Sequence, residues 1–143
     1  MDKYDALKIE NQLCFPLYAG AKEMIKKYKP YLDQIDLTYT QYITMMVLWE
    51  YGQMNVKELG NRLYLDSGTL TPLLKKLESK GMVMRKRSDI DERNMTVTLT
   101  EKGMQLREEA VSIPEKIGGC VNLTPEEMSV LYRLLYKVLG KEM

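Results

Sequence analysis

The sequence has no histidine and two cysteines, Cys14 and Cys120, among its 143 residues. Without histidine the chain lacks the usual general base, the Ser-His-Asp and Cys-His nucleophile pairs, and the commonest metal ligand. The two cysteines form no Cys-x-x-Cys motif, which argues against a structural zinc site or a disulfide-stapled secreted fold. There is no glycine-rich phosphate-binding loop either. We therefore expect no metal, no cofactor and no enzymatic activity of these types.

Long apolar runs are also absent, so no segment is predicted to span a bilayer. The first residues, Met1 to Asp5, lack the basic and apolar regions of a signal peptide, which predicts a cytoplasmic protein. The formal net charge is +1, which argues against a protein that coats nucleic acid without selectivity. The length corresponds to about one domain, residues 1–143, with enough chain to bury a core.

The strongest pattern in the chain is a helix predicted to follow Asp66 or Ser67, either of which can cap its N-terminus. Gly81 is placed to end this helix in a left-handed conformation. Its inner face carries leucines at helical spacing: Leu70, Leu73, Leu74 and Leu77. Its outer face is small, hydroxylated and basic: Gly68, Thr71, Pro72, Lys75, Lys76 and Ser79.

A shorter helix is predicted to begin after Asn55, with Glu58 three residues on in the manner of a capping box. Two short helices joined by a few residues favour a helix-turn-helix. In that motif the second helix enters the DNA major groove and presents side chains near its N-terminus to base edges. Ser67, Thr69 and Thr71 are suited to such contacts.

A basic β-hairpin is predicted next, with strands at 82–87 and 95–100 and a polar turn at 88–94, as in the wing of a winged helix. From Lys75 to Arg93 the sequence has seven basic and four acidic residues, a local excess that favours phosphate contacts. Asp91 can orient the Arg93 guanidinium, although an ordinary turn aspartate is equally compatible with the sequence. The alternative for the whole surface is a solvated polar face without a ligand.

Helices are also predicted on both sides of this unit. The first runs from about Tyr4 to Lys29 and ends before Pro30, and Pro16 is expected to kink the turn that carries Cys14. A second begins at Thr38 or Thr40 and stops at Gly52.

After the hairpin, Thr100 is expected to cap one continuous helix as far as Gly118 and Gly119. Thr124 and Pro125 then start a last helix with a wide apolar face. Terminal helices this apolar need a cover, and a homodimer provides it while presenting two reading helices to successive major grooves. Packing of both helices on their own domain is the alternative.

A set of motifs resembles the MarR family of winged-helix regulators, and within it the organic hydroperoxide resistance repressors. The resemblance covers nearly the whole chain and is carried by these segments: Asn11 to Phe15, Tyr28, Tyr39, Gln41-Tyr42, Leu65 to Pro72, and Asp91 to Arg93.

The resemblance implies a mainly α fold, a winged helix-turn-helix (α+β) at 53–101 with dimerisation helices at 1–37 and 104–143. It also implies that Cys14 is the peroxide sensor and that Tyr28 and Tyr39 of the partner subunit hydrogen-bond to it. In some relatives a second cysteine resolves the oxidised sensor, a role that Cys120 could fill. Residue chemistry alone leaves alternatives: a cysteine on an apolar helix face is most often a small buried hydrophobe, and core packing is the alternative role for Tyr28 and Tyr39.

The function predicted is a repressor that binds double-stranded operator DNA as a homodimer and releases it when organic hydroperoxide oxidises Cys14. One alternative is a MarR-type regulator released by a small phenolic or lipophilic ligand, and another is a thiol peroxidase that uses Cys14. The residues predicted to contact DNA are Asp66, Ser67, Gly68, Thr69, Thr71, Pro72, Lys75, Lys76, Arg85, Arg87, Asp91 and Arg93.

Overall fold

The computed structural model describes residues 2–88 and 94–141, so the predictions for Asp91 and Arg93 lie outside the described residues. The chain divides into two compact units, Met1–Ile113 and Pro114–Met143, which are described separately. Within the described ranges, no helix is both long enough and apolar enough to cross a membrane.

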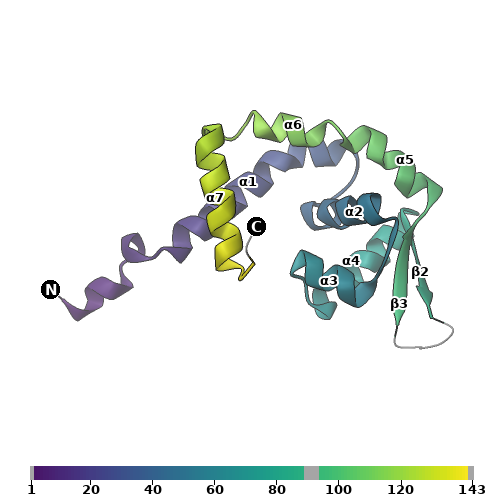
Figure 1. Ribbon diagram of the computed structural model, residues 1–143, viewed down its shortest axis with the longest axis horizontal. Coiled ribbons are helices and arrows are strands. Elements are labelled where there is room, and N and C mark those ends of the chain that lie inside the picture. The colour runs from purple at the N-terminus through teal and green to yellow at the C-terminus, as the bar shows by residue number, and fades with distance from the viewer. Residues whose placement is uncertain (1, 89–93, 142–143) are drawn as a thin grey trace. The chain divides into compact units, whose positions relative to one another are not determined.

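The structure is mainly helical with one small sheet, in agreement with the predicted fold class (Figure 1). Among its described residues, the first unit contains two 3-10 turns, helices and three strands, in the order η1 (Lys3–Leu7), η2 (Ile9–Asn11), α1 (Cys14–Gln34), α2 (Tyr39–Tyr51), β1 (Gln53–Asn55), α3 (Val56–Leu63), α4 (Ser67–Ser79), β2 (Val83–Arg87), β3 (Met95–Leu99) and α5 (Glu101–Ala110). The chain continues with α6 (Ile113–Gly118), which begins at the last residue of the first unit, and with α7 (Pro125–Val138).

The helix starts follow the polar caps expected from the sequence. Asp66 accepts the backbone N–H of Thr69 at 2.8 Å and begins α4. Thr38 and Thr124 form complete capping boxes with Gln41 and Glu127. Asn55 caps α3 and Thr100 caps α5 through their side chains alone. The capping box expected at Asn55 does not close, because the Glu58 carboxylate pairs with Arg62 instead.

The helix ends at two glycines are also as predicted. Gly52 (φ 80°) follows α2, and Gly81 (φ 79°) follows the last residues of α4. A positive φ is strained for residues with a Cβ, which explains glycine at both positions.

The prediction for the first helix was wrong at both ends. Residues 3–11 form two 3-10 turns, and α1 begins at Cys14, which places Pro16 in the first turn, where backbone N–H groups have no helical partner. Pro16 therefore does not kink the helix. Pro30 lies inside α1, which continues to Gln34 because burial of Leu32 outweighs the hydrogen bond that proline removes.

The helix expected from Thr100 to Gly118 is interrupted at Val111 and Ser112, between α5 and α6. Pro114 explains the break, because in a continuous helix it would have no N–H to donate to the carbonyl of Ala110 and its ring would crowd that carbonyl. The stop at Gly118 was predicted correctly.

The sheet has the strand order β1-β3-β2, with both pairs antiparallel. The β2–β3 hairpin has the predicted form, with Arg85 opposite Val97 and Arg87 opposite Met95. Strand β1 was not predicted, because its three residues are too few for an alternating pattern to be recognised.

Helix α2 forms the centre of the core. It contacts α1, α3, α4, α5 and the strands β1 and β3, and its Met45, Leu48 and Thr44 are completely buried. The four leucines of α4 are buried as predicted. Helix α2 therefore joins the N-terminal helix to the helix-turn-helix and the sheet.

A close approach at Gly103 fixes α5 against the start of β2. A Cβ at this position would lie 2.1 Å from the Met82 carbonyl oxygen, and the Gly103 carbonyl accepts a 2.8 Å hydrogen bond from the Trp49 indole. We expect Gly103→Ala to lower the free energy of unfolding by about 1 to 3 kcal/mol, since the backbone must shift to admit the methyl group. Denaturant unfolding followed by fluorescence of Trp49, the one tryptophan in the sequence, measures this change.

Gly118→Ala is the matched control, because nothing lies within 4 Å of a Cβ built there. Its free energy of unfolding should stay within about 0.5 kcal/mol of the parent value. Equal stability of the two alanine variants would show that the approach at Gly103 imposes no constraint.

Candidate functional site

The N-terminal turn of α4 presents the short polar side chains expected to face DNA. Asp66, Ser67, Gly68 and Thr69 are exposed, and Thr71 is half-buried. Asp66 is held in place by its capping bond, and the backbone hydrogen bond from Thr69 lowers the pKa of its carboxyl. A carboxylate that accepts backbone N–H groups is fixed in orientation, so the first role of Asp66 is to cap α4. We call α4 the reading helix, because it is the helix predicted to enter the DNA major groove.

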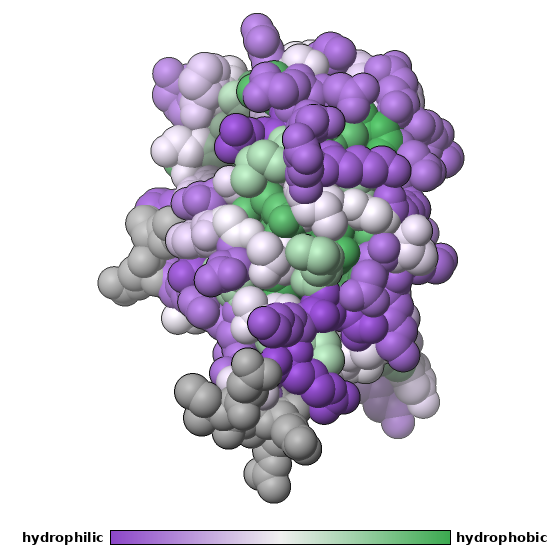
Figure 2. Space-filling view, turned by 90° about the vertical axis from the view of Figure 1, so that its right-hand side faces the viewer, coloured by the Kyte–Doolittle hydropathy of each residue, from purple (hydrophilic) through white to green (hydrophobic). Residues whose placement is uncertain are grey.

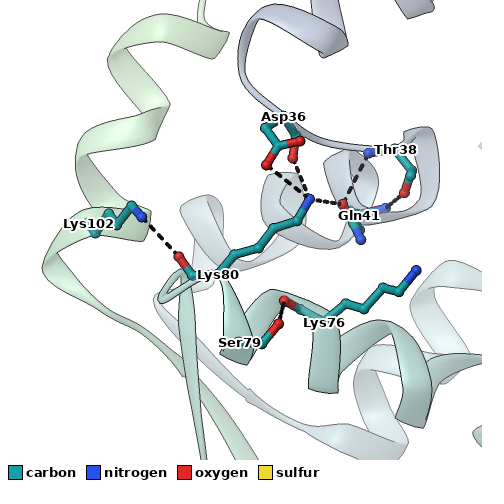
Figure 3. Close-up of polar contacts among 7 residues, drawn as sticks. All are labelled: Asp36, Thr38, Gln41, Lys76, Ser79, Lys80 and Lys102. Carbon is teal, nitrogen blue, oxygen red and sulfur yellow. Dashed lines mark hydrogen bonds and ion pairs between the residues drawn. The ribbon is translucent and has the colours of Figure 1, made fainter.

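The exposed side of α4 is basic after its first turn. Pro72, Lys75 and Lys76 are exposed, in contrast to the buried leucines between them. In the close-up, the Lys76 ammonium points away from the polar contacts around Lys80 (Figure 3). Both lysines therefore remain accessible to a phosphate backbone.

A groove of about 970 Å³ joins α3 and α4 to the β2–β3 hairpin. It brings together several residues that were predicted separately: Asp66, Ser67, Thr71, Lys75, Arg85 and Arg87. Figure 2 shows the side of the molecule on which the β2–β3 hairpin lies. Hydrophilic side chains cover most of this face, and a smaller apolar area lies among them. The groove is bounded by a helix and a basic hairpin, and hydroxyl and cationic side chains stand in it among apolar ones, an arrangement suited to a nucleic-acid strand.

Arg85 has a protein partner, which sequence reasoning missed. Its guanidinium donates to the Glu78 carboxylate of α4 at 3.2 and 3.4 Å, and its backbone N–H donates to the other carboxylate oxygen at 3.1 Å. These bonds lower the pKa of Glu78, and the Arg85 side chain is only 18% exposed. Arg85 therefore joins the hairpin to α4, and the signal available in the sequence was Glu78, the one acidic residue between Lys75 and Arg87.

Cys14 is exposed and is the first residue of α1. This differs from the buried position that its apolar neighbours in the sequence suggested. An exposed thiol at the start of a helix is accessible to an oxidant from solvent.

Tyr28 and Tyr39 do lie together, and a third tyrosine joins them. The ring centroids are 5.0 Å apart for Tyr28 and Tyr39, 5.7 Å for Tyr28 and Tyr42, and 6.3 Å for Tyr39 and Tyr42. Burial raises the pKa of all three, and for Tyr42 burial together with its two neighbours raises the pKa to about 12. The three hydroxyls are thus neutral donors at neutral pH.

The tyrosine cluster is distant from Cys14 of the same chain. Cys14 and Tyr28 are fourteen residues apart on one helix, which corresponds to about 21 Å along its axis. A hydrogen bond between them within one subunit is therefore excluded by the length of α1.

Cys120 is also exposed. It follows α6, where its thiol donates to the Lys116 carbonyl at 3.3 Å and its backbone N–H donates to that of Ile117 at 2.9 Å. In the part of the chain that the structure describes, no group of three or more Cys, Asp or Glu side chains is arranged to hold a metal ion.

Comparison with known proteins assigns the family. Residues 26–110 match the protein family described as transcriptional regulator SarA/Rot. The chain is 49% identical over 138 residues to the organic hydroperoxide resistance transcriptional regulator of Bacillus subtilis, covering 96% of this chain and 94% of that protein.

Two solved structures of AbfR, a protein of Staphylococcus epidermidis, also resemble this chain at 34% sequence identity. The reduced form bound to DNA has a TM-score of 0.79 and covers 97% of each chain. The disulfide form has a TM-score of 0.66 and covers 96% of each chain. The chain therefore belongs to the MarR family of winged-helix regulators, in its organic hydroperoxide resistance branch.

Proposed function

We propose that this chain is a redox-sensing, DNA-binding repressor that acts in the cytoplasm and releases its operator when organic hydroperoxide oxidises Cys14. The observation that carries the proposal is the exposed Cys14 thiol at one end of α1, together with a cluster of neutral tyrosines at the junction of α1 and α2. Helix α2 packs against α4, the helix that presents the DNA-reading residues. The role is regulatory, and we infer no catalytic turnover.

DNA binding rests on the groove between α4 and the hairpin. Ser67, Thr69 and Thr71 supply hydroxyls suited to base edges, and Lys75, Lys76 and Arg87 supply charge for phosphates. Arg85 acts on this surface through Glu78, because that pair sets the position of the hairpin beside the reading helix. For Asp91 and Arg93 the proposed DNA contacts rest on the sequence alone.

A homodimer is supported by exposed apolar side chains in two regions. Leu7, Ile9, Leu13, Phe15 and Leu17 are exposed near the start of the chain. In α7, the exposed apolar side chains are Met128, Val130, Leu131, Tyr132, Leu134 and Val138. Surfaces of this kind mark protein interfaces, so we assign residues 1–37 and 104–143 to dimerisation and residues 53–101 to the winged helix-turn-helix.

A dimer also explains how Cys14 and Tyr28 can interact although they are far apart in one chain. Because Tyr28 lies about 21 Å from Cys14 along α1, a Tyr28 hydroxyl that donates to the Cys14 sulfur has to come from another chain. We assign this role to the partner subunit's Tyr28 and the partner subunit's Tyr39. Their raised pKa keeps each hydroxyl protonated, so each can donate to a thiolate or to a sulfenic acid.

The sensing step is a two-electron oxidation of sulfur. The Cys14 thiolate attacks one oxygen of the hydroperoxide, an S–O bond forms and the O–O bond breaks, and the leaving alkoxide takes a proton to become an alcohol. Cys14 becomes a sulfenic acid. In a second step the Cys120 thiol can displace water from that sulfenic acid and form a disulfide.

A small-molecule effector is the second candidate, favoured by a cleft of about 280 Å³ between α1 and the start of α2. Its lining includes Ile25, Leu32, Leu37 and Tyr39, which are suited to an apolar or phenolic ligand. The volume is just below the usual range of ligand sites, about 300 to 1,000 Å³, so the oxidation of Cys14 remains the primary proposal.

Replacement of Cys14 by serine tests the proposal. Cys14→Ser should bind an operator duplex obtained by in vitro selection with unchanged affinity, yet keep it after cumene hydroperoxide is added, because serine cannot form a sulfenic acid. Fluorescence anisotropy of the labelled duplex measures both properties. Cys120→Ser is the control, since it removes the other thiol and should still release DNA. Release by the oxidised Cys14→Ser protein would show that the sensor lies elsewhere.

Glu78→Gln distinguishes two roles for the Glu78–Arg85 pair. Removal of a negative charge from the reading helix should tighten DNA binding by simple electrostatics. If the pair positions the hairpin, affinity should instead fall, with the slope of log K against log salt nearly unchanged. Lys75→Met is the comparison, because loss of one phosphate contact should lower that slope by about one unit. Tighter binding by Glu78→Gln would contradict the positioning role.

The role of Cys120 is tested on a non-reducing gel. Protein oxidised by hydroperoxide without added thiol should run as a covalent dimer, since we propose that Cys120 of one subunit pairs with the partner's Cys14. Cys120→Ser should remain monomeric on the gel and leave Cys14 open to overoxidation. A monomer band from the oxidised parent protein would assign Cys14 to reaction with a small cellular thiol instead.

A further inference from the structure

Lys80 lies at the C-terminal end of α4, in the basic stretch of the sequence, but its ammonium contacts protein oxygens (Figure 3). It donates to the Asp36 carbonyl at 2.5 Å and to the Gln41 side-chain oxygen at 3.1 Å, and it lies 3.7 Å from the Asp36 carboxylate. The Lys80 side chain is 26% exposed, whereas Asp36 is 91% exposed. One cation thus joins the end of the reading helix to the connection between α1 and α2.

The Gln41 oxygen in this contact has a second function. Gln41 is 4% exposed, and the same oxygen accepts the Thr38 backbone N–H at 3.1 Å in the capping box of α2. Tyr39 lies between Thr38 and Gln41 and is the first residue of α2. A displacement of the backbone at Tyr39 would therefore act on the capping box whose Gln41 oxygen holds Lys80.

Asp36 provides the link to α1. It follows the C-cap of α1 and has a φ of 54°, a left-handed conformation that is costly for residues with a Cβ. A cation beside its carbonyl is favourable, because the C-terminal end of a helix carries partial negative charge. The Lys80 contact therefore stabilises a bent connection that a change between α1 and α2 would disturb.

The backbone around Lys80 is held from the other side as well. The Lys80 carbonyl accepts the Lys102 ammonium of α5 at 3.0 Å, and Gly81 follows with φ 79°. The end of α4 is thus fixed to α5 by its backbone and to the α1–α2 connection by its side chain. Movement of that connection reaches α4 through the Lys80 side chain.

We propose that Lys80 is a positioning residue that transmits the state of the tyrosine cluster to the DNA-reading helix. This inference rests on the proposed function, since it concerns how oxidation of Cys14 reaches α4. In the reduced protein, packing against α2 keeps α4 in the orientation that binds DNA, and Lys80 ties the end of α4 to the α1–α2 connection. When oxidation displaces Tyr39, the acceptors of Lys80 move and α4 moves with them.

Lys80→Met tests this role, because methionine retains most of the side-chain length and removes the charge and the donor. The Gln41 oxygen keeps its Thr38 partner in this variant, so no buried acceptor loses its last hydrogen bond. Lys102→Met is the matched control, since it removes an equal charge near the same helix end without contacting the α1–α2 connection. Operator affinity is measured by anisotropy before and after one equivalent of cumene hydroperoxide per subunit, and Cys14 sulfenic acid is measured by dimedone labelling and mass spectrometry.

We expect reduced Lys80→Met to bind the operator within about threefold of the parent affinity and to form sulfenic acid to the same extent. The ratio of oxidised to reduced dissociation constants should fall by at least about fivefold, since allosteric couplings are commonly about 5 to 150-fold. Lys102→Met should keep the parent ratio. If Lys80→Met does not fold, as judged by Trp49 fluorescence, the shorter and neutral Lys80→Gln is assessed by the same criteria.

A parent-like ratio in Lys80→Met, with Cys14 oxidised, would overturn the role of Lys80 and leave the proposed function intact. A severe loss of affinity in the reduced variant would also overturn it, because Lys80 would then be a DNA contact or a structural support. Failure of the parent protein itself to release DNA on oxidation would refute the proposed function instead.

Discussion

Burial of α2 is the constraint on which the rest of the first unit depends. Met45 and Leu48 have no exposed surface, and the helix is in contact with α1, α3, α4, α5 and two strands. A close-packed core does not deform continuously, so a displacement at one site is passed on by the movement of whole helices and strands. Since the first turn of α2 carries Tyr39 and Tyr42, a change at its N-terminus acts on the helix-turn-helix through a rigid body.

Polar contacts at the two ends of α4 complement this packing. Asp66 builds the exposed start of the helix, Glu78 fixes the hairpin through Arg85, and Lys80 fixes the connection between α1 and α2. The Asp66 contact begins a helix, whereas the Glu78 and Lys80 contacts join segments that are separated in the sequence. The reading helix is thereby positioned by groups that do not themselves need to touch DNA.

Much of this arrangement could be predicted from local sequence. Caps such as Asp66, Thr100 and Thr124 act on N–H groups within three residues, so the sequence contains the whole interaction. The strand β1, the Arg85–Glu78 pair and the Lys80 contact depend on segments brought together by folding, which no local pattern encodes. The errors at Pro16, Pro30 and Pro114 have the same origin, because the effect of a proline depends on its position in the helix and on the packing around it.

The central claim is that Cys14 is oxidised once by hydroperoxide and that this single event releases DNA. Titration of the reduced protein–operator complex with cumene hydroperoxide, without added thiol, measures both quantities together. DNA release should be complete at about one hydroperoxide per subunit, with one equivalent of alcohol formed. Continued consumption of hydroperoxide, or DNA still bound after Cys14 is fully oxidised, would contradict the sensing role.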